Sequence, residues 1–315
     1  MNHIFPDYYE DFRCIASRCR HNCCIGWEID IDEDTLRLYK GIEGNFGKWL
    51  RENISEDDNP HFILKEDDRC PFLNDRNLCD IICEFSEDHL CQICREHPRF
   101  HNELPQRVES GLGLSCEEAA RLILTKESKT TLVGEGDTDD EIILLRDKII
   151  ETFQHRDLYI EERIREALTL INAEEYPFEK EYAKDFFLSL EMLDHKWEET
   201  LALLDVNLKS SQKESFLALF KERETVFEQF AVYLIYRHCA CAPTLFDARI
   251  RVLFAIYCLR LYIALCEGLF ALRGDLSDDD FIEIAREFSS EIEYSDENLY
   301  EILYRIEDHS EQESL

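Results

Sequence analysis

Basic residues are scarce in this sequence. Its 315 residues include 35 Lys and Arg against 69 Asp and Glu, which gives a formal net charge of −34. A chain this acidic repels phosphate backbones, so we expect no nucleic-acid partner. A lysine-bearing protein would instead be attracted to it, although a strongly acidic surface can also serve only to keep a protein soluble.

An export signal and an uninterrupted apolar run are both missing. The first ten residues are acidic and aromatic, without the basic start and apolar core of a signal peptide, so we expect a cytoplasmic protein. The most apolar run, residues 252–272, is interrupted by Arg260 and Glu267, which predicts a buried helix rather than a membrane span. Because the cytoplasm keeps thiols reduced, clustered cysteines there predict metal binding or catalysis rather than disulfides.

A dinucleotide-binding loop is missing too. Gly134-x-Gly136 lacks the remainder of the glycine fingerprint, and no convincing strand precedes it. The surrounding residues 126–137 are polar and favour a linker between two domains. The sequence has no internal repeat and no low-complexity tract.

Cysteine, by contrast, is abundant and unevenly placed. Ten of the fourteen cysteines lie in the first 116 residues, in tight groups separated by acidic, polar sequence. Polar loops do not need thiols for packing, so these groups predict a metal or iron–sulfur module. The candidate ligands are Cys14, Cys19, Cys23, Cys24, Cys70, Cys79, Cys91, Cys94 and Cys116.

The spacing leaves the metal open. Four thiolates suffice for one zinc ion or one [4Fe–4S] cluster, so nine leave room for two sites, or for one site with additional structural thiols. Zinc usually shows two Cys-x2-Cys pairs, and only Cys91 and Cys94 have that form. The irregular spacing therefore favours an iron–sulfur cluster, with zinc as the alternative.

Metal or anion binding is less strongly indicated for the other side chains near these cysteines. Four histidines are possible extra ligands but more typical of surface or hydrogen-bonding roles: His21, His89, His97 and His101. Arg95 and Arg99 flank the Cys91–Cys94 pair and could hold an anion, such as a cofactor carboxylate or phosphate, or neutralise a thiolate cluster. Cys83 is not assigned as a ligand. The last four cysteines lie in apolar helical sequence and are interpreted as small buried side chains: Cys239, Cys241, Cys258 and Cys266.

The second half of the sequence has a helical hydrophobic period. Two long apolar segments, residues 216–238 and 245–272, are expected to form its buried centre. Ser277 and Asp280 have the spacing of a capping box, and Asp34 is the expected N-cap of an earlier helix. The prediction is a mainly α protein. A cysteine-rich metal-binding module with little regular sheet (residues 1–125) is followed by a linker (126–137) and an all-α helical domain (138–315).

Taken in order, the cysteine motifs resemble those of the flagellin lysine-N-methylase family, which is related to cysteine-rich zinc- or iron-chelating proteins. The resemblance covers about the first 125 residues. Its motifs are Phe12-x-Cys14-x4-Cys19-x3-Cys23-Cys24-x2-Trp27-x-Ile29-x2-Asp32, Cys70-x-Phe72-Leu73, Leu78-Cys79-x-Ile81, Leu90-Cys91-x2-Cys94-x3-Pro98-Arg99 and Cys116-x-Glu118-Ala119-Ala120.

This resemblance implies a function that composition does not show. It implies methyl transfer from S-adenosylmethionine to the ε-amino group of lysines on flagellin, by an enzyme that carries an iron–sulfur cluster. The sequence has neither a Rossmann-type cofactor loop nor a Cys-x3-Cys-x2-Cys radical motif, and many acidic and tyrosine side chains are eligible as the general base. The alternative is a non-catalytic zinc- or iron–sulfur-binding module with a chelating, sensing or assembly role.

Overall fold

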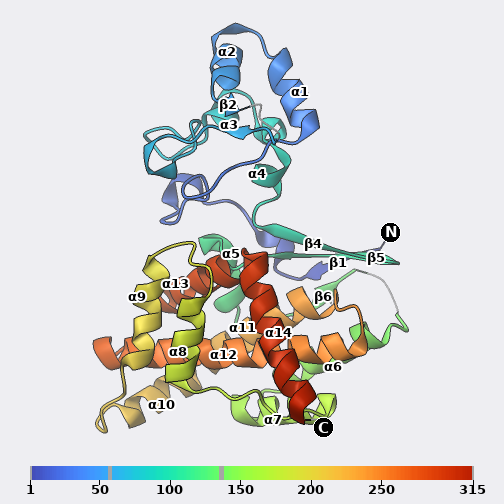
Figure 1. The fold of residues 1–315 in the computed structure, drawn as a ribbon, viewed down its shortest axis with the longest axis vertical. Helices are drawn as coiled ribbons and strands as arrows, with labels where there is room; N and C mark the ends of the chain where they lie inside the picture. The colour runs from blue at the N-terminus through green and yellow to red at the C-terminus, as the bar shows by residue number, and fades with distance from the viewer. Residues whose placement is uncertain (1, 56–58, 135–137, 314–315) are drawn as a thin grey trace. The chain divides into compact units, whose positions relative to one another are not determined.

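The computed structural model describes residues 2–55, 59–134 and 138–313 (Figure 1). The chain divides into two compact units, Met1–Phe12 with His101–Leu315, and Arg13–Phe100. We call the first the helical unit and the second the cysteine unit. This division differs from the expected boundary near residue 125, because the start of the chain and residues 101–125 belong with the later helices.

The protein is mainly helical, as predicted, and every element described within residues 138–313 is a helix. The helices of the helical unit are α5 (Glu117–Leu124), α6 (Glu141–Phe153), α7 (Ile160–Ile171), α8 (Lys180–Ser189), α9 (Lys196–Leu201), α10 (Lys213–Glu222), α11 (Glu224–Cys239), α12 (Leu245–Arg273), α13 (Asp278–Phe288) and α14 (Asp296–Glu313). Shorter turns are η1 (Tyr9–Asp11), η5 (Ala202–Asp205) and the π-helix η6 (Ser289–Glu293).

A small sheet joins these helices, in the order β4-β5-β1-β6. The strands are β1 (Asn2–Pro6), β4 (Arg99–Leu104), β5 (Arg107–Leu112) and β6 (Leu132–Val133). The parallel pairing of β1 with β5 aligns Asn2 with Arg107 and Ile4 with Glu109. Tyr236 of α11 donates its hydroxyl to the carbonyl of Ser110 at 3.0 Å, which fastens the sheet to the helices.

The expected linker is packed rather than extended where it is described. Thr130 is buried and donates its hydroxyl to Gln229 of α11 at 2.7 Å. Gln229 in turn donates to the carbonyls of Lys126 and Ser128. Residues 135–137, which include Gly136, lie outside the described residues.

Helices α11 and α12 form the centre of the helical unit. α12 is long and apolar enough to cross a membrane, since an 18-residue window has a mean hydropathy of 1.8. However, 78% of that window is buried inside the structure, which confirms the prediction of a buried helix. Gly268 packs against the backbone of Leu203, where an added Cβ would lie 2.1 Å from the carbonyl oxygen, so η5 and α12 touch without a side chain between them.

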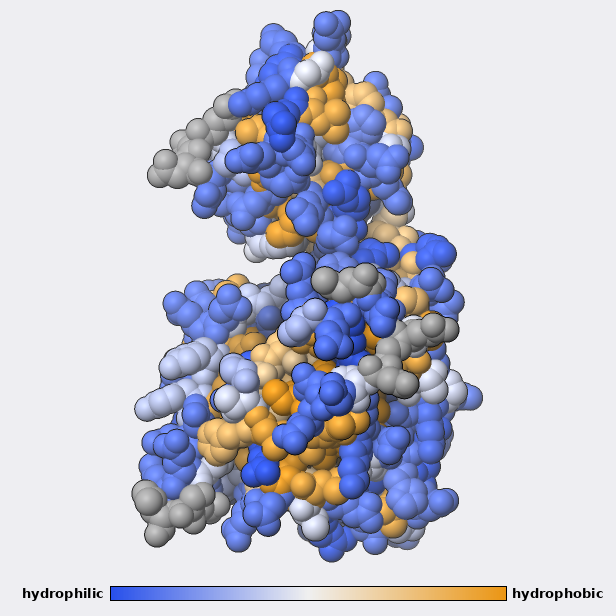
Figure 2. All heavy atoms as spheres, turned by 90° about the vertical axis from the view of Figure 1, so that its right-hand side faces the viewer, coloured by the Kyte–Doolittle hydropathy of each residue, from blue (hydrophilic) through white to orange (hydrophobic). Residues whose placement is uncertain are grey.

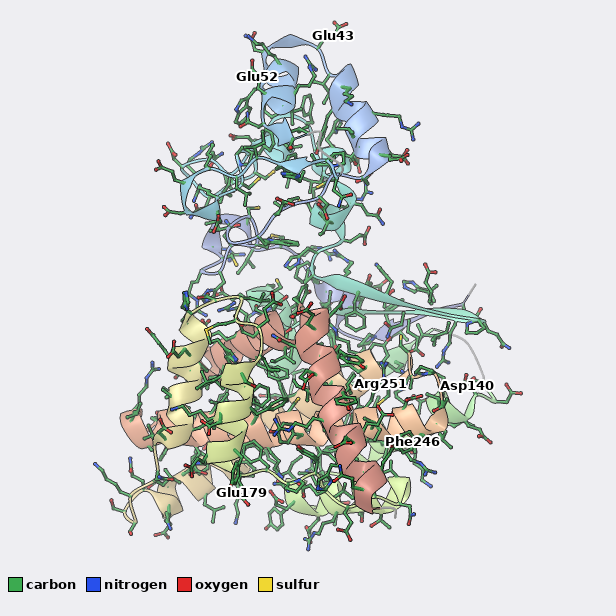
Figure 3. All side chains as sticks on the ribbon, viewed as in Figure 1. Glu43, Glu52, Asp140, Glu179, Phe246 and Arg251 are labelled. Carbon is green, nitrogen blue, oxygen red and sulfur yellow. The ribbon has the colours of Figure 1, made fainter. Side chains whose placement is uncertain are left out.

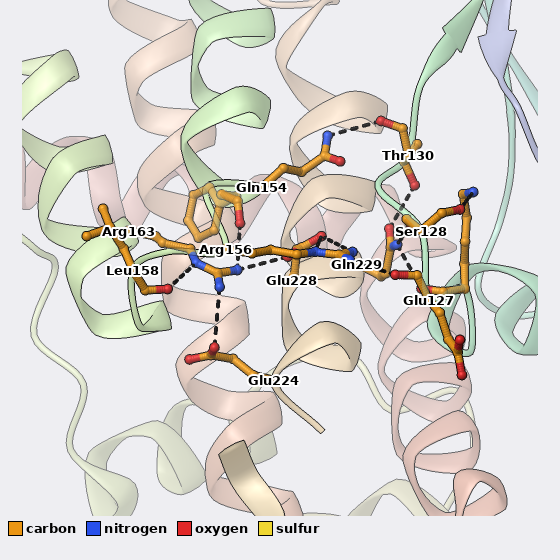
Figure 4. Close-up of polar contacts among 12 residues, drawn as sticks. Glu127, Ser128, Thr130, Gln154, Arg156, Leu158, Arg163, Glu224, Glu228 and Gln229 are labelled. Atoms are coloured by element: carbon orange, nitrogen blue, oxygen red, sulfur yellow. Dashed lines mark hydrogen bonds and ion pairs between the residues drawn. The ribbon is translucent and has the colours of Figure 1, made fainter. Parts of the chain in front are cut away.

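Two ion pairs hold α7, and the connection between α6 and α7, to α11 (Figure 4). Glu228 of α11 accepts hydrogen bonds from Arg156 at 2.8 Å and from Arg163 at 2.9 Å. Arg163 also donates to the carbonyls of Phe153 and Leu158. Its guanidinium therefore holds the end of α6 and the connection that follows it against α7. Burying a guanidinium is unfavourable unless its charge and its donors are matched, and here both are.

One side of the helical unit exposes apolar side chains. Figure 2 shows them gathered on the face toward the viewer, where the end of α12 that carries Phe246 lies, as labelled in Figure 3. Leu144 of α6 is 50% exposed and Phe246 is 41% exposed. Partly exposed apolar side chains are common on protein surfaces.

The cysteine unit has short elements and long connections. They are η2 (Ala16–Arg18), α1 (Glu33–Gly41), α2 (Gly44–Glu52), β2 (Ile54–Ser55), β3 (His61–Phe62), η3 (Glu66–Asp68), α3 (Asp80–Glu84), η4 (Glu87–His89) and α4 (Gln92–Glu96). An apolar cluster that includes Tyr39, Leu50, Phe62 and Phe72 forms its core. This core is small, and a disulfide or a metal can add stability to a unit of this kind.

Candidate metal centre

Five of the nine candidate ligands meet at the core of the cysteine unit. Cys70 and Cys91 are buried within the apolar cluster, while Cys24, Cys79 and Cys94 pack against it. Figure 3 draws sulfur atoms in yellow. Among the described residues, no three His, Cys, Asp or Glu side chains are arranged as a formed metal-ion site. The five thiols are therefore neighbours that are not set at coordination geometry.

Backbone contacts bring these thiols together from three separate segments. The N–H of Cys70 donates to the carbonyl of Cys24 at 2.8 Å. Cys79 pairs with Leu73 in an isolated antiparallel bridge, so it returns to the loop that follows Cys70. Cys91 precedes α4 as its N-cap residue, and Cys94 lies within that helix.

Backbone N–H groups lie near three of the sulfurs. In each case the N–H belongs to a residue two or three positions later in the chain. The pairs are Cys70 with Phe72 and Leu73, Cys79 with Ile81 and Ile82, and Cys91 with Cys94. Such N–H donors favour the thiolate over the thiol, because they stabilise the negative charge.

Burial opposes ionisation at the same atoms. Burial, together with the charges of Cys79 and Cys91, outweighs the N–H donors and raises the pKa of Cys70 to about 11. Burial likewise raises the pKa of Cys79. The Cys94 thiol donates a hydrogen bond to Cys91, which lowers the pKa of Cys91 and raises the pKa of Cys94.

The five sulfurs and the N–H groups near them suit a metal bound by thiolates. The N–H groups are aimed at sulfurs that become thiolates, yet several thiolates in one buried place repel one another. A metal cation would relieve that repulsion and displace the protons. Four thiolates suffice for zinc or for a [4Fe–4S] cluster, and the cysteine unit brings together five.

Asp32 and Tyr39 support these five thiols, a role that their local sequence does not indicate. The Asp32 carboxylate accepts from the N–H of Thr35 at 2.9 Å and from the N–H of Gln92, next to Cys91, at 2.8 Å. Burial alone would raise the pKa of Asp32, but these donors hold it below its usual value. The Tyr39 hydroxyl donates to the carbonyl of His89 at 2.7 Å. Both contacts hold the turn that carries Cys91, although only the fold reveals them.

The remaining candidate ligands lie elsewhere. Cys14 and Cys23 are exposed, and Cys19 is half-buried. Cys23 accepts a hydrogen bond from the Cys24 thiol, which lowers its pKa, so it borders the five-thiol cluster. Cys116 is the N-cap of α5, as expected, and therefore belongs to the helical unit.

The four histidines near the cysteine motifs have different surroundings. His89 stacks on Phe85 with ring centroids 4.8 Å apart. His101 shares a hydrogen bond with Ser110 at 2.6 Å. Burial lowers the pKa of His97 to about 4, which leaves it neutral at physiological pH. His21 accepts a hydrogen bond from the Cys19 thiol through its carbonyl, so that contact does not involve its ring.

The two arginines proposed to hold an anion are positioned differently. Arg95 is exposed on α4 and lies 3.9 Å from the carboxylate of Glu96. Arg99 is half-buried and begins β4. Nothing among the described contacts of Arg95 selects a cofactor.

The last four cysteines confirm the expectation in part. Cys239, Cys258 and Cys266 are buried, as small apolar side chains would be. For Cys241 the expectation was wrong, because α11 ends at Cys239 and leaves Cys241 exposed in the following turn.

A buried polar cluster in the helical unit surrounds Tyr233 and reaches Leu114, two residues before Cys116. The Tyr233 hydroxyl accepts from the N–H of Leu114 at 3.2 Å and from Arg237 at 2.7 Å. It donates to Glu293 at 2.8 Å, and His238 contacts the same carboxylate at 2.7 Å. Thus Tyr233 satisfies its one donor and two acceptor positions while holding the segment that leads to α5.

A cavity of about 10 Å³ lies beside this cluster. Tyr8, Gln229, Tyr233 and Tyr236 line it together with apolar side chains. It has room for about one water molecule, so S-adenosylmethionine does not fit there.

Comparisons with known proteins match part of the chain. The sequence profile described as the FliB lysine N-methylase C-terminal domain matches residues 122–315. A lysine-N-methylase of Salmonella choleraesuis (strain SC-B67) is 26% identical over 126 residues, which is 38% of this chain and 31% of that protein. The lysine-N-methylase of Salmonella typhimurium matches to the same extent.

A flagellar biosynthetic protein, FliU of Salmonella muenchen, is 25% identical over 126 residues, or 38% of this chain and 75% of that protein. The chain thus spans about a third of the length of the two methylases it matches. No solved structure matches it.

Proposed function

This chain belongs to the FliB lysine N-methylase family, and we propose that it transfers methyl groups from S-adenosylmethionine to lysine side chains of a flagellar protein. The observation that carries the proposal is the family match, which extends over residues 122–315 and so includes α6 to α14. The names of the curated relatives refer to lysine methylation and to flagellar biosynthesis, and they support the same reaction and substrate.

The chemistry requires a neutral lysine aligned with the sulfonium of the donor. A carboxylate or phenol near the amine would take up its proton. The net charge of −34 would attract a lysine-bearing substrate. Arg95 and Arg99 are the proposed contacts for the donor's carboxylate, because guanidinium groups bind carboxylates in a bidentate manner.

The proposal includes a thiolate-bound iron–sulfur cluster in the cysteine unit. Cys24, Cys70, Cys79, Cys91 and Cys94 would supply its ligands, since they already lie side by side. A cluster there would supply a redox-active, charged centre bonded to three segments of the chain. The alternative is a zinc ion in the same thiolates, with a purely structural role.

Anaerobic purification tests the metal. Iron and acid-labile sulfide in equal amounts, with broad visible absorption, would support the cluster. A colourless protein with stoichiometric zinc would contradict it and make the centre structural.

Mass spectrometry tests the reaction. Metal-loaded protein is incubated with S-adenosylmethionine and purified flagellin, and peptides are searched for lysines that gained methyl groups. Methylated flagellin lysines support the proposal. Retained metal without methylation, at any donor concentration, would favour the non-catalytic module instead.

A further inference from the structure

The outer face of α14 carries a pair of stacked tyrosines. Tyr300 is 67% exposed and Tyr304 is 51% exposed, and their ring centroids lie 6.2 Å apart at an interplanar angle of 14°. Ile302 and Ile306, on the opposite face of the same helix, are fully buried. In Figure 1, α14 is the dark red helix that crosses the front of the helical unit. Its tyrosine pair therefore presents aromatic surface to solvent, away from the core.

Carboxylates flank this pair at helical spacing. Glu297 lies three residues before Tyr300, Glu301 lies three residues before Tyr304, and both are exposed. Within the part of the chain that the structure describes, neither Glu297 nor Glu301 forms an ion pair. We call Glu297, Tyr300, Glu301 and Tyr304 the α14 face.

Other aromatic and charged side chains on this helix are engaged within the unit. The guanidinium of Arg305 lies 4.2 Å from the ring centroid of Phe186 in α8. The rings of His309 and Tyr176 meet edge to face at 5.1 Å. The α14 face differs from these, because among the described residues its rings stack only on each other, and its carboxylates are exposed.

We propose that the α14 face docks a lysine-bearing segment of the protein substrate. An ammonium group is attracted to the face of an aromatic ring and to a nearby carboxylate, and this face offers two of each. The tyrosine rings also offer apolar contact to the four-carbon stem of lysine. The docking chemistry follows from the surface itself, whereas naming the partner as the substrate rests on the proposed function.

Charge decides among the possible occupants. Nucleic acid and acidic proteins are repelled by the carboxylates of this face and by the net charge of −34. A second copy of this chain docked through the same face would place Glu297 and Glu301 against their own counterparts, and like charges across an interface are unfavourable. A cationic segment is the occupant that these side chains complement.

Direct binding tests the proposal without methylation. The probe is a fluorescein-labelled peptide in which lysine alternates with alanine, and the readout is fluorescence anisotropy with the full-length, metal-loaded protein. We expect Y300A/Y304A to weaken binding by roughly 5- to 30-fold, from the loss of two exposed cation–π contacts. The variant Y182A is the matched control, because Tyr182 on α8 is 72% exposed and is not part of this face.

A second pair of variants distinguishes binding at the α14 face from general attraction by the net negative charge. E297Q/E301Q and E198Q/E199Q remove the same number of charges, and Glu198 and Glu199 are exposed on α9. Weaker binding for E297Q/E301Q alone supports the docking face. Equal weakening by both variants would overturn it in favour of diffuse attraction, as would equal binding of a glutamate-containing peptide or no binding at all.

The outcome is independent of the proposed function. If flagellin is methylated and Y300A/Y304A leaves its KM unchanged, the docking face is wrong while the methylase activity stands. If the lysine peptide binds through this face and no methylation occurs, the docking face stands and the methylase activity fails.

Discussion

Replacing Glu293 with Gln should destabilise the helical unit in a pH-dependent way. The Glu293 carboxylate is buried and contacts Tyr233, Arg237 and His238. Burial alone would raise its pKa, but Arg237 and the hydrogen bond from His238 outweigh it and lower the pKa from 4.5 to about 2. Burial also lowers the pKa of His238, so the ring is neutral at pH 7 and donates its N–H to Glu293.

The size of the effect follows from this shift. A carboxylate whose pKa falls from 4.5 to about 2 on folding contributes about 3 kcal/mol to the free energy of unfolding. Because the folded pKa is depressed, this contribution is complete above pH 4.5 and is lost as the pH falls toward 2. The E293Q variant has no such contribution, so its deficit should be about 3 kcal/mol at pH 7 and about 1 kcal/mol smaller at pH 3.5.

Urea unfolding with a single fluorescent reporter measures both values. Trp197 is 2% exposed in the helical unit, and the W27F/W49F background removes the two tryptophans of the cysteine unit. Wild type and E293Q are compared at pH 7 and pH 3.5 in that background. A deficit of equal size at both pH values would refute the reasoning, because it would show that the loss comes from packing rather than from charge.

Three other changes test neighbouring parts of the structure. E228L should lower the free energy of unfolding by about 3 kcal/mol, because Arg163 stays buried without its main partner. R163M/E228L removes that unpaired charge and should recover at least half of the lost stability. A double variant that is less stable than E228L in urea would contradict this. D32A should lower the free energy of unfolding of the cysteine unit by about 1 kcal/mol or more, because α1 loses its N-cap and the N–H of Gln92 loses its acceptor. Trp49 fluorescence during urea unfolding measures this loss. An unchanged urea midpoint would contradict the prediction. C70S/C91S should remove the metal while C258S retains it, as judged by metal analysis; full metal content in C70S/C91S would disprove these ligands.

Local signals in the sequence predicted several features correctly. Ser277 and Asp280 form the predicted capping box, and Cys116 begins α5. Each of these depends on residues only a few positions apart, so short-range chemistry decides it. The N-cap of α1 is different, because Asp32 takes the place expected for Asp34. Gln92, sixty residues later, also binds Asp32, and such a distant contact is not visible in the local pattern.

Features that depend on contacts between residues far apart in the sequence could not be predicted. The sequence marked nine thiols as candidates, but only the fold shows that Cys24, Cys70, Cys79, Cys91 and Cys94 are neighbours while Cys116 lies in the other unit. The boundary near residue 125 rested on polar composition, yet residues 126–134 are held by Gln229. Hydrogen bonds to a distant helix outweigh what composition alone suggests.

The parallel pairing of β1 with β5 has a consequence for synthesis on the ribosome. Asn2 and Ile4 are made about a hundred residues before their partners Arg107 and Glu109. The cysteine unit between them is complete before β5 exists, so it can fold, and bind the metal that we propose for it, while β1 is still unpaired. A deletion of β1 would therefore leave β5 and β6 without their shared partner strand, while the proposed metal-binding step in the cysteine unit would be untouched.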